Sequence, residues 1–297
     1  MSALAVALVT SRVARPLDED LAPLEHALRR AGAAVSIADW DDPDVEWRAA
    51  HLALLRSPWD YTQRLPEFLA WAERTSAQTR LRNPWPVIRW NTDKHYLAQL
   101  AQAAVPIVPS CFIEPGEAGG AGLRRFFALQ SDSSEFVVKP AVGAGSRDAQ
   151  RYEHADAEAA ALHVQRLLDA RQAVLLQPYL DRVDDEGETA LIYFNGIFSH
   201  AIRKGPLLRR GEGPTRALFA EEHIIPRMPD ANELRVGAQT LTAMPFDTPL
   251  YARVDLLRDA AGAPRVLELE LTEPSLFFQH APGAAADFAS VILESLR

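Results

Sequence analysis

The sequence predicts a mixed α/β fold, of the α+β kind, in three consecutive parts: residues 1–90, 91–180 and 181–297. The first part alternates short apolar runs with segments of helical periodicity, which is typical of buried strands covered by helices. In the middle part a strand runs into a glycine-rich loop. The last part contains two hairpin signals, so it is expected to be rich in β-structure.

Composition narrows the class of protein. The chain has 297 residues, of which 48% are hydrophobic and 24% charged, enough for two or three packed units. A formal net charge of −9 argues against a general nucleic-acid or anionic-membrane surface. No apolar run reaches the roughly 18 residues of a membrane span, and the apolar first ten residues lack the basic start of a signal peptide. Cys111 is the single cysteine, which suits a reducing cytoplasm, so a cytoplasmic protein is expected.

Apolar spacing predicts the elements in order. In the first part we expect strands at residues 4–9, 34–37 and 51–55 and helices at 21–31 and 66–77, with the proline cluster 83–86 as the exit. The middle part is expected to begin with a helix capped by Asn91 or Thr92, and then to run strand, helix, strand, glycine loop, helix and strand up to residue 180. The last part is expected to hold hairpins at 189–203 and 251–271 and a closing helix at 284–297.

The second of these hairpins is the most informative feature of the sequence. Strand side chains alternate between faces, so Arg253 and Asp255 share one face, and Glu268 and Glu270 share a face of the partner strand. The opposite faces are apolar and include Leu267, Leu269 and Leu271. A shift of the register by one residue would bury the acids and expose these leucines.

One register brings the charges together. If Arg258 pairs with Arg265 across the turn, Asp255 lies opposite Glu268 and Arg253 opposite Glu270. Like charges across a ladder destabilise a sheet unless a cation intervenes, and Mg²⁺ typically binds one or two carboxylates plus substrate phosphates. The carboxylates therefore indicate a magnesium site; a solvated strand face with an incidental Arg–Glu pair is the alternative.

Two lysines and the glycine loop indicate phosphate binding. Lys139 ends an apolar strand that leads into a loop containing Gly143, Gly145 and Ser146, whose small residues allow backbone N–H groups to approach an anion. The loop is not a P-loop, and alone it would be an ordinary tight turn. Lys94 is placed in the first turn of its helix, where a cation costs a few tenths of a kcal/mol unless an anion is near.

In combination, these motifs resemble the ATP-grasp superfamily, and its glutathione-synthetase-like branch in particular. The matching segments run in order along nearly the whole chain: Asp93-Lys94, Val138-Lys139-Pro140 with its loop, residues 177–180, Gly187-Glu188, Arg203, and Asp255 with Glu268 and Glu270. The resemblance implies an ATP-grasp fold with an N-terminal α/β substrate-side domain, a small central lid domain and a C-terminal β-rich catalytic domain. It also implies ATP and Mg²⁺ as cofactors and a carboxylate–amine ligase that forms an acyl phosphate and releases ADP and phosphate.

The resemblance also assigns roles to residues. Lys94 and Lys139 would hold the α- and β-phosphates, and the loop with Gly143, Gly145 and Ser146 would close over them. Backbone groups of residues 177–180, including Gln177, Tyr179 and Leu180, would bind adenine, and Glu188 would bind the ribose hydroxyls. Arg203 and Arg253 would stabilise the transferring phosphoryl group, and Asp255, Glu268 and Glu270 would bind magnesium.

The chain departs from the family pattern at the acceptor side of the metal site. The family usually has Asn where this chain has Glu270, and the usual Pro-Gly that follows is replaced by Glu273-Pro274-Ser275. Glu273 and Ser275 are therefore candidate substrate residues, and Glu273 could equally be an ordinary turn residue.

A narrower resemblance concerns residues 56–61 and 267–276. They are similar to the subgroup that contains the O-ureido-serine cyclo-ligase of the cycloserine pathway, which closes an isoxazolidinone ring on an ATP-activated carboxylate. Arg56, Trp59, Asp60 and Tyr61 follow a strand at a carboxyl end, where open α/β sheets bind ligands. They are candidate substrate residues for a small amino acid, and a loop packing its rings on a neighbour is the alternative.

Three functions remain open at this point. The first is carboxylate activation with cyclisation of a small amino acid, the second an amino-acid or peptide ligase forming an intermolecular amide, and the third a non-catalytic nucleotide sensor. The expected partner is a small amino-acid-like molecule, with no nucleic acid and no membrane, and a homodimer is compatible with the sequence. The glycine loop 142–146 and the segment 205–214, with its glycines, prolines and Arg209-Arg210, are expected to cover the intermediate.

Overall fold

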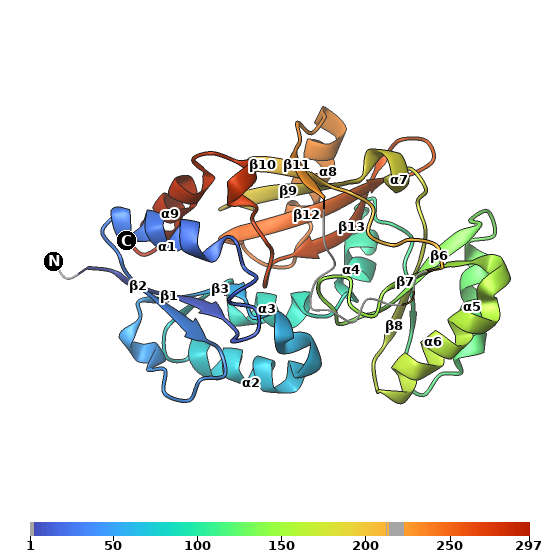
Figure 1. The fold of residues 1–297 in the computed structure, drawn as a ribbon, viewed down its shortest axis with the longest axis horizontal. Coiled ribbons are helices and arrows are strands. Elements are labelled where there is room, and N and C mark those ends of the chain that lie inside the picture. Colours follow the sequence, from blue (N-terminus) through green and yellow to red (C-terminus); the bar gives the residue numbers. More distant parts are fainter. Residues whose placement is uncertain (1–2, 212, 214–222) are drawn as a thin grey trace.

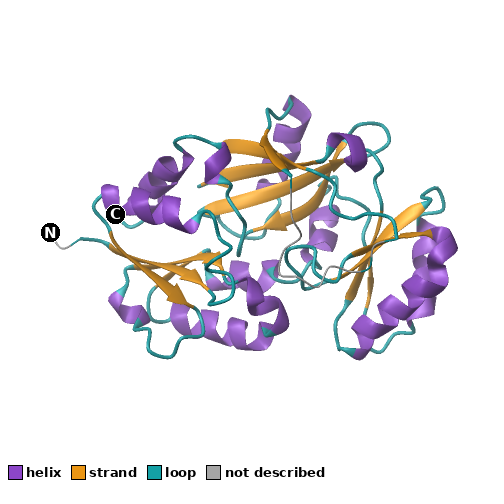
Figure 2. Ribbon diagram, in the orientation of Figure 1, coloured by secondary structure: helices purple, strands orange, loops and turns teal. Residues whose placement is uncertain are grey.

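The chain folds around three separate sheets, each with its own helices (Figures 1 and 2). A computed structural model describes residues 3–211, 213 and 223–297. Strands β1–β4, β5–β8 and β9–β13 form the three sheets, and each sheet lies within one of the three predicted parts of the sequence. The domain boundaries at 90 and 180 stay predictions. No helix in the described ranges is long and apolar enough to cross a membrane.

The N-terminal sheet is parallel, with the strand order β2-β1-β3-β4. Its three predicted strands are present as β1 (Ala5–Thr10), β2 (Ala34–Asp39) and β3 (Leu52–Ser57), and β4 (Arg80–Arg82) is a short edge strand that lacks a clear apolar run. The predicted helices are α1 (Leu21–Arg30) and α2 (Leu65–Ser76), which pack on opposite faces of the sheet. Short 3-10 helices lie at η1 (Trp47–Ala49) and η2 (Trp59–Gln63).

The connection to the central sheet differs from the prediction. A helix that the prediction omitted, α3 (Trp85–Asn91), begins within the proline cluster, because proline is compatible with the first helical turn. Asn91 ends this helix, and its side-chain amide bonds the backbone of Leu269 and Leu271 instead of capping a following helix. Helix α4 (Tyr96–Gln102) starts only after Lys94, which therefore lies in the turn between two helices.

The central sheet is antiparallel, with the order β5-β8-β6-β7, and helices α5 and α6 pack together on it. The predicted strands are β5 (Cys111–Ile113), β6 (Glu135–Pro140) and β8 (Val174–Pro178), and the helices are α5 (Gly119–Leu129) and α6 (Ala157–Asp169). The prediction omitted β7 (Gln150–Glu153) and the 3-10 turn η3 (His154–Asp156) after the glycine loop, because four mixed residues show no periodicity.

The C-terminal sheet is antiparallel, with the order β11-β10-β9-β12-β13. Its strands are β9 (Glu188–Phe194), β10 (Ile197–Lys204), β11 (Ile224–Pro226), β12 (Tyr251–Arg258) and β13 (Pro264–Glu270). Asn195 and Gly196 have positive φ angles of 49° and 77° and close the β9–β10 hairpin as predicted. The helices of this part are α7 (Val183–Glu186), α8 (Ala231–Thr242), η4 (Phe278–His280) and α9 (Ala284–Glu294).

The two faces of this sheet pack against different parts of the chain. One face packs Val254, Leu256 and Leu269 against α4 and α8. The other packs Ile202 and Tyr251, together with α9, against α1 and the N-terminal sheet. Farther along the strands this second face becomes polar, and there it forms a wall of the candidate site.

Candidate active site

Most of the predicted site residues meet in a cavity between the polar face of the C-terminal sheet and the central sheet, and Trp59 of the N-terminal part also lines it. The glycine loop and the segment 177–180 form the opposite walls. The predicted residues that line this cavity are Trp59, Lys94, Lys139, Gly143, Gly145, Ser146, Gln177, Tyr179, Leu180, Glu188, Arg253, Asp255, Glu268, Glu270, Glu273 and Ser275.

The register of the β12–β13 hairpin decides how the acids meet. Arg253 pairs with Glu270 and Asp255 with Glu268, as the sequence predicts. The predicted pair of Arg258 with Arg265 is wrong, because a bulge lies between the ends of the hairpin and Arg258 pairs with Pro264 instead. A bulge inserts one extra residue into one strand, so the register changes along the ladder.

The same bulge changes the position of one predicted core leucine. Leu269 and Leu271 lie in the buried core behind the sheet, as alternation requires. Leu267 is the extra residue opposite β12, and it lines the cavity beside Glu268. The bulge thus adds an apolar side chain to the polar face, and alternation alone could not reveal it.

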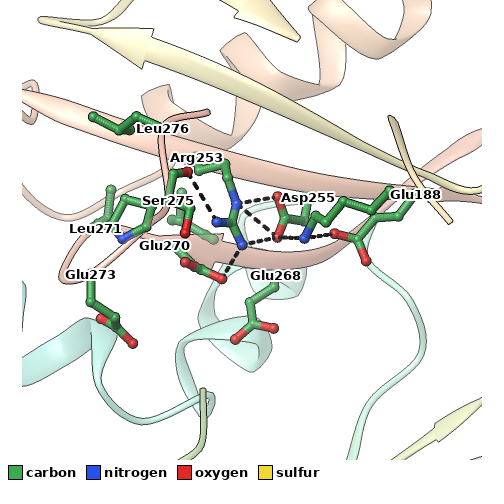
Figure 3. A network of polar contacts seen from close by, with 12 residues as sticks. Glu188, Arg253, Asp255, Glu268, Glu270, Leu271, Glu273, Ser275 and Leu276 are labelled. Carbon is green, nitrogen blue, oxygen red and sulfur yellow. Dashed lines mark hydrogen bonds and ion pairs between the residues drawn. The ribbon is translucent and has the colours of Figure 1, made fainter. Parts of the chain in front are cut away.

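Arg253 holds two carboxylates of the hairpin face together (Figure 3). Its guanidinium donates to Asp255 at 2.8 Å, forms an ion pair with Glu270, and donates to the Ser275 carbonyl oxygen at 3.2 Å. Lys204 forms ion pairs with Asp255, at 3.0 Å, and with Glu188. Burial raises the pKa of Asp255, but Arg253 and Lys204 outweigh this effect and hold the pKa below its usual range.

Lys94 connects the glycine loop to the acidic strand. Its ammonium group lies 2.7 Å from the Glu268 carboxylate and donates to the Gly143 carbonyl oxygen at 2.6 Å. Burial lowers the pKa of Lys94, but the pairing with Glu268 outweighs it and the pKa is raised. The position in the inter-helix turn removes the expected conflict with a helix dipole, and the partner that fixes this lysine is a carboxylate.

Lys139 is the contrasting cation. It is the next-to-last residue of β6 and lines the cavity, and its ammonium group makes no hydrogen bond or ion pair with the part of the chain that the structure describes. Desolvation by burial, opposed by Glu268 and reinforced by Lys94, lowers the pKa of Lys139 to about 8. A positive charge that is desolvated and has no counter-ion favours an anion in the cavity.

Two other carboxylates of the cavity are destabilised as anions. Burial, only partly opposed by Arg253, raises the pKa of Glu270 to about 8, and Asp255 and Glu268 add to the effect. Burial likewise raises the pKa of Glu188 to about 7 against the influence of Lys204. Over the described ranges, no three His, Cys, Asp or Glu side chains are arranged to hold a metal ion by themselves.

Arg203 is not at the predicted place. Its guanidinium donates to the carbonyl oxygens of Glu186 and Asp185 at 2.6 and 2.8 Å, and it does not line the cavity. Side chains of β10 alternate, so the neighbouring Lys204 faces the cavity in its stead. The prediction missed Lys204, although this residue lies two positions after Ile202 and therefore on the same face of the strand.

The segment 177–180 forms the wall opposite the hairpin. Gln177 is buried and donates to the Ser110 hydroxyl at 3.0 Å, and Leu180 lines the cavity. The Tyr179 hydroxyl donates to Asp184 at 2.5 Å, and the guanidinium of Arg151 lies 3.5 Å from the centre of its ring. These contacts hold the segment to which the resemblance assigns adenine binding.

The segment 205–214, which was predicted to cover the intermediate, lines the cavity with some of its described residues. Of residues 205–214, Glu212 and Pro214 lie outside the described residues. Gly205, Leu207 and Leu208 line the cavity. Arg210 reaches the central sheet, where it pairs with Glu135 at 2.8 Å. The buried Arg151, and after it Arg210, outweigh the effect of burial and lower the pKa of Glu135 to about 2.

Of the four candidate substrate residues in 56–61, only Trp59 lines the cavity. Its indole N–H donates to the Glu273 carbonyl oxygen at 2.9 Å. Arg56 and Tyr61 lie behind the turn that carries Glu273 and contact that turn, not the cavity. The prediction for Asp60 differs from the structure: it faces away, accepting hydrogen bonds from Trp40 and Arg64, because the 3-10 helix η2 turns successive side chains to different sides.

Comparison with known proteins places this geometry in a family. Residues 6–83 match the family model described as D-cycloserine synthetase DcsG, N-terminal domain. Over 299 residues the chain is 42% identical to the cycloserine biosynthesis protein DcsG of Streptomyces lavendulae, covering 98% of this chain and 99% of that protein. The chain belongs to the DcsG family.

The crystal structure of D-cycloserine synthetase DcsG superposes with a TM-score of 0.93 at 41% identity, covering 99% of this chain and 100% of that one. Two more distant structures share the fold alone. The ATP-grasp ligase PsnB, complexed with a phosphomimetic variant of a minimal precursor, Mg and ADP, has a TM-score of 0.66 at 19% identity over 98% of both chains. The D-alanine–D-alanine ligase of Bacillus anthracis complexed with ATP has a TM-score of 0.66 at 16% identity, covering 100% of this chain and 97% of that one. The predicted ATP-grasp fold is thus confirmed for this DcsG-family chain.

Proposed function

We propose that this chain uses ATP and Mg²⁺ to activate the carboxylate of a small amino acid as an acyl phosphate, which a nitrogen of the same molecule attacks to close a ring. The observation that carries the proposal is the near-complete, 42% identical match to DcsG, whose name denotes cycloserine biosynthesis. The substrate class proposed is therefore O-ureido-serine and similar amino acids.

The proposed reaction has two steps. In the first, a carboxylate oxygen forms a bond to the terminal phosphorus of ATP, the bond between that phosphorus and the bridging oxygen breaks, and ADP leaves. In the second, the nitrogen attacks the acyl carbon, the C–O bond to phosphate breaks, and phosphate departs with one former carboxylate oxygen. The attacking nitrogen releases a proton to solvent or to a basic side chain.

The cavity residues fit ATP. The uncompensated ammonium group of Lys139 and the backbone around Gly143, Gly145 and Ser146 would hold the phosphates, with Lys94 beside them. Backbone groups of residues 177–180 would bind adenine between Leu180 and the apolar side chains of Leu257 and Leu267. Glu188 would bind the ribose, and Arg253 would stabilise the charge of the transferring group.

The hairpin carboxylates fit Mg²⁺ only together with phosphate oxygens. Glu268 and Glu270 are partly exposed to the cavity, whereas Asp255 is enclosed by Arg253 and Lys204. We assign Glu268 and Glu270, with Asp255 behind them, as the ligand set, because Mg²⁺ needs few carboxylates when phosphates complete its shell. Bound there, the ion would neutralise charge on the transferring phosphoryl group.

A substrate screen tests the proposal. We expect O-ureido-serine alone to stimulate release of ADP and inorganic phosphate, and mass spectrometry to find a cyclic product. Consumption of ATP only with two different amino acids would establish an intermolecular ligase. A protein that binds ATP but does not turn it over with any amino acid would be a nucleotide sensor, and the proposal would be wrong.

A further inference from the structure

The turn after β13 presents one carboxylate, that of Glu273, to the cavity. Glu273 is 7% exposed, and burial raises its pKa to about 7 although Tyr61, Lys94 and Arg253 oppose this effect. Figure 3 shows its carboxylate projecting to the same side of the hairpin as that of Glu268, away from Leu276.

The N-terminal part holds this carboxylate rigidly. The Tyr61 hydroxyl donates to Glu273 Oε1 at 2.5 Å, and the Trp59 indole N–H donates to the Glu273 carbonyl oxygen. Arg56, which is 1% exposed, donates to the Pro274 carbonyl oxygen at 2.6 Å. Three large buried side chains from one segment therefore hold the turn that carries Glu273, and Tyr61 also holds one oxygen of its carboxylate.

The second oxygen of this carboxylate is available to a ligand. Among the described residues, Oε1 accepts the only hydrogen bond recorded for the carboxylate, and no ion pair within 4.0 Å reaches it. The two cations that lower the pKa of Glu273 are paired with other carboxylates: Lys94 pairs with Glu268 and donates to Gly143, and Arg253 pairs with Asp255 and Glu270. A buried carboxylate without its own cation is costly, so a cationic ligand would stabilise it.

We infer that Glu273 binds the protonated α-amino group of the substrate, with Tyr61 as the residue that positions it. This inference deepens the proposed function and rests on it, because it presumes that the substrate carboxylate lies at the phosphoryl end of the same cavity. The site then selects a zwitterionic amino acid over a simple carboxylic acid.

Binding measurements test the inference without requiring turnover. The probes are O-ureido-serine and its deamino analogue, 3-(ureidooxy)propanoate, titrated calorimetrically into the protein saturated with ADP and Mg²⁺. A charge-assisted hydrogen bond predicts that the wild type prefers the amino acid by roughly 10- to 100-fold. In Glu273→Gln this preference should fall below about threefold, with ADP affinity unchanged.

Two further variants separate positioning from general damage. Tyr61→Phe keeps the ring and the carboxylate but loses the hydrogen bond, so it should reduce the preference by a smaller factor and leave ADP affinity intact. Glu158→Gln, at an exposed position of α6, removes the same charge far from the cavity and should change neither value.

The outcomes distinguish the two claims. Equal binding of both probes by the wild type, no detectable binding of either, or an undiminished preference in Glu273→Gln would overturn the inference. A preference that depends on Glu273 in a protein that never releases ADP would uphold the inference and refute the proposed reaction.

Discussion

Replacement of Lys139 by methionine should weaken nucleotide binding and leave the fold intact. Methionine retains the apolar length of the side chain and removes a charge that has no partner in the described chain. A hydrogen bond to a charged group contributes about 1.5–3 kcal/mol. At about 1.4 kcal/mol per factor of ten, the Kd for ADP should rise roughly 10- to 150-fold.

The stability of the two lysine variants should differ in sign. Lys139→Met leaves no carboxylate unpaired, so the midpoint of thermal unfolding should stay the same or rise. Lys94→Met removes the counter-ion of Glu268, which lies 2.7 Å away, so its midpoint should fall. Calorimetric titration with ADP and thermal unfolding without nucleotide measure the two effects separately.

The pH dependence provides a second measurement of the same group. Burial lowers the pKa of Lys139 in the folded chain to about 8, from an ordinary value of 10.5. Between these two pH values the unfolded chain binds more protons than the folded chain. The free energy of unfolding of the nucleotide-free wild type should therefore gain a contribution that increases with pH, and Lys139→Met should lack this contribution. Phosphate binding requires the charged lysine, so above pH 8 ADP affinity of the wild type should fall by up to about tenfold per pH unit. An unchanged Kd in Lys139→Met, or the same pH slope in both proteins, would refute the assignment of Lys139.

Three further perturbations have distinct expected results. Glu268→Gln should retain the fold and nucleotide binding but reduce Mg²⁺-dependent turnover by at least tenfold; undiminished ADP release would remove Glu268 from the metal site. Arg210→Gln should raise the KM for ATP severalfold and speed proteolysis near residue 210 in the presence of ATP, Mg²⁺ and substrate. The stability of the fold should change little, since the Arg210 side chain of this pair is exposed. Asp20→Asn should lower the free energy of unfolding by about 2–4 kcal/mol, because the Asp20 carboxylate accepts three backbone hydrogen bonds from residues 276–278; a chemical denaturation midpoint equal to the wild type would contradict this.

The acidic hairpin shows what the sequence could predict. Strict alternation and a burial requirement determined which side chains share a face, so Arg253, Asp255, Glu268 and Glu270 meet as expected. The bulge was beyond this reasoning, because an extra residue in one strand depends on the whole ladder. It moved Leu267 into the cavity, where an apolar side chain suits a flat ring.

Errors of one or two residues account for other differences. Arg203 was predicted to face the cavity, but its neighbour Lys204 does so instead. Only the alternation that starts from the buried Ile202 tells these two adjacent basic residues apart. The direction of Asp60 could not be predicted, since a 3-10 turn has no apolar period that indicates which side chain faces inward. Lys94 was assigned to the first turn of a helix because the proline cluster resembles the end of a segment. Helix α3 begins within the cluster, and the next helix therefore starts only after Lys94.

Contacts between distant segments were the least predictable. The turn of Glu273 is held by Tyr61, a separation of 212 residues, and nothing local in either segment indicates the other. The same holds for Arg210 and Glu135, which lie 75 residues apart. Local pattern could therefore nominate these residues, and only the fold could show which of them contact one another.

Transfer of a labelled oxygen tests the central claim most directly. O-ureido-serine carrying ¹⁸O in both carboxylate oxygens should yield inorganic phosphate with one ¹⁸O atom for each ring formed, and unlabelled ADP, because the carboxylate oxygen bonds to phosphorus and leaves with it. Label found in AMP, with release of pyrophosphate, would show that the carboxylate is adenylated and would contradict the acyl-phosphate account of this chain.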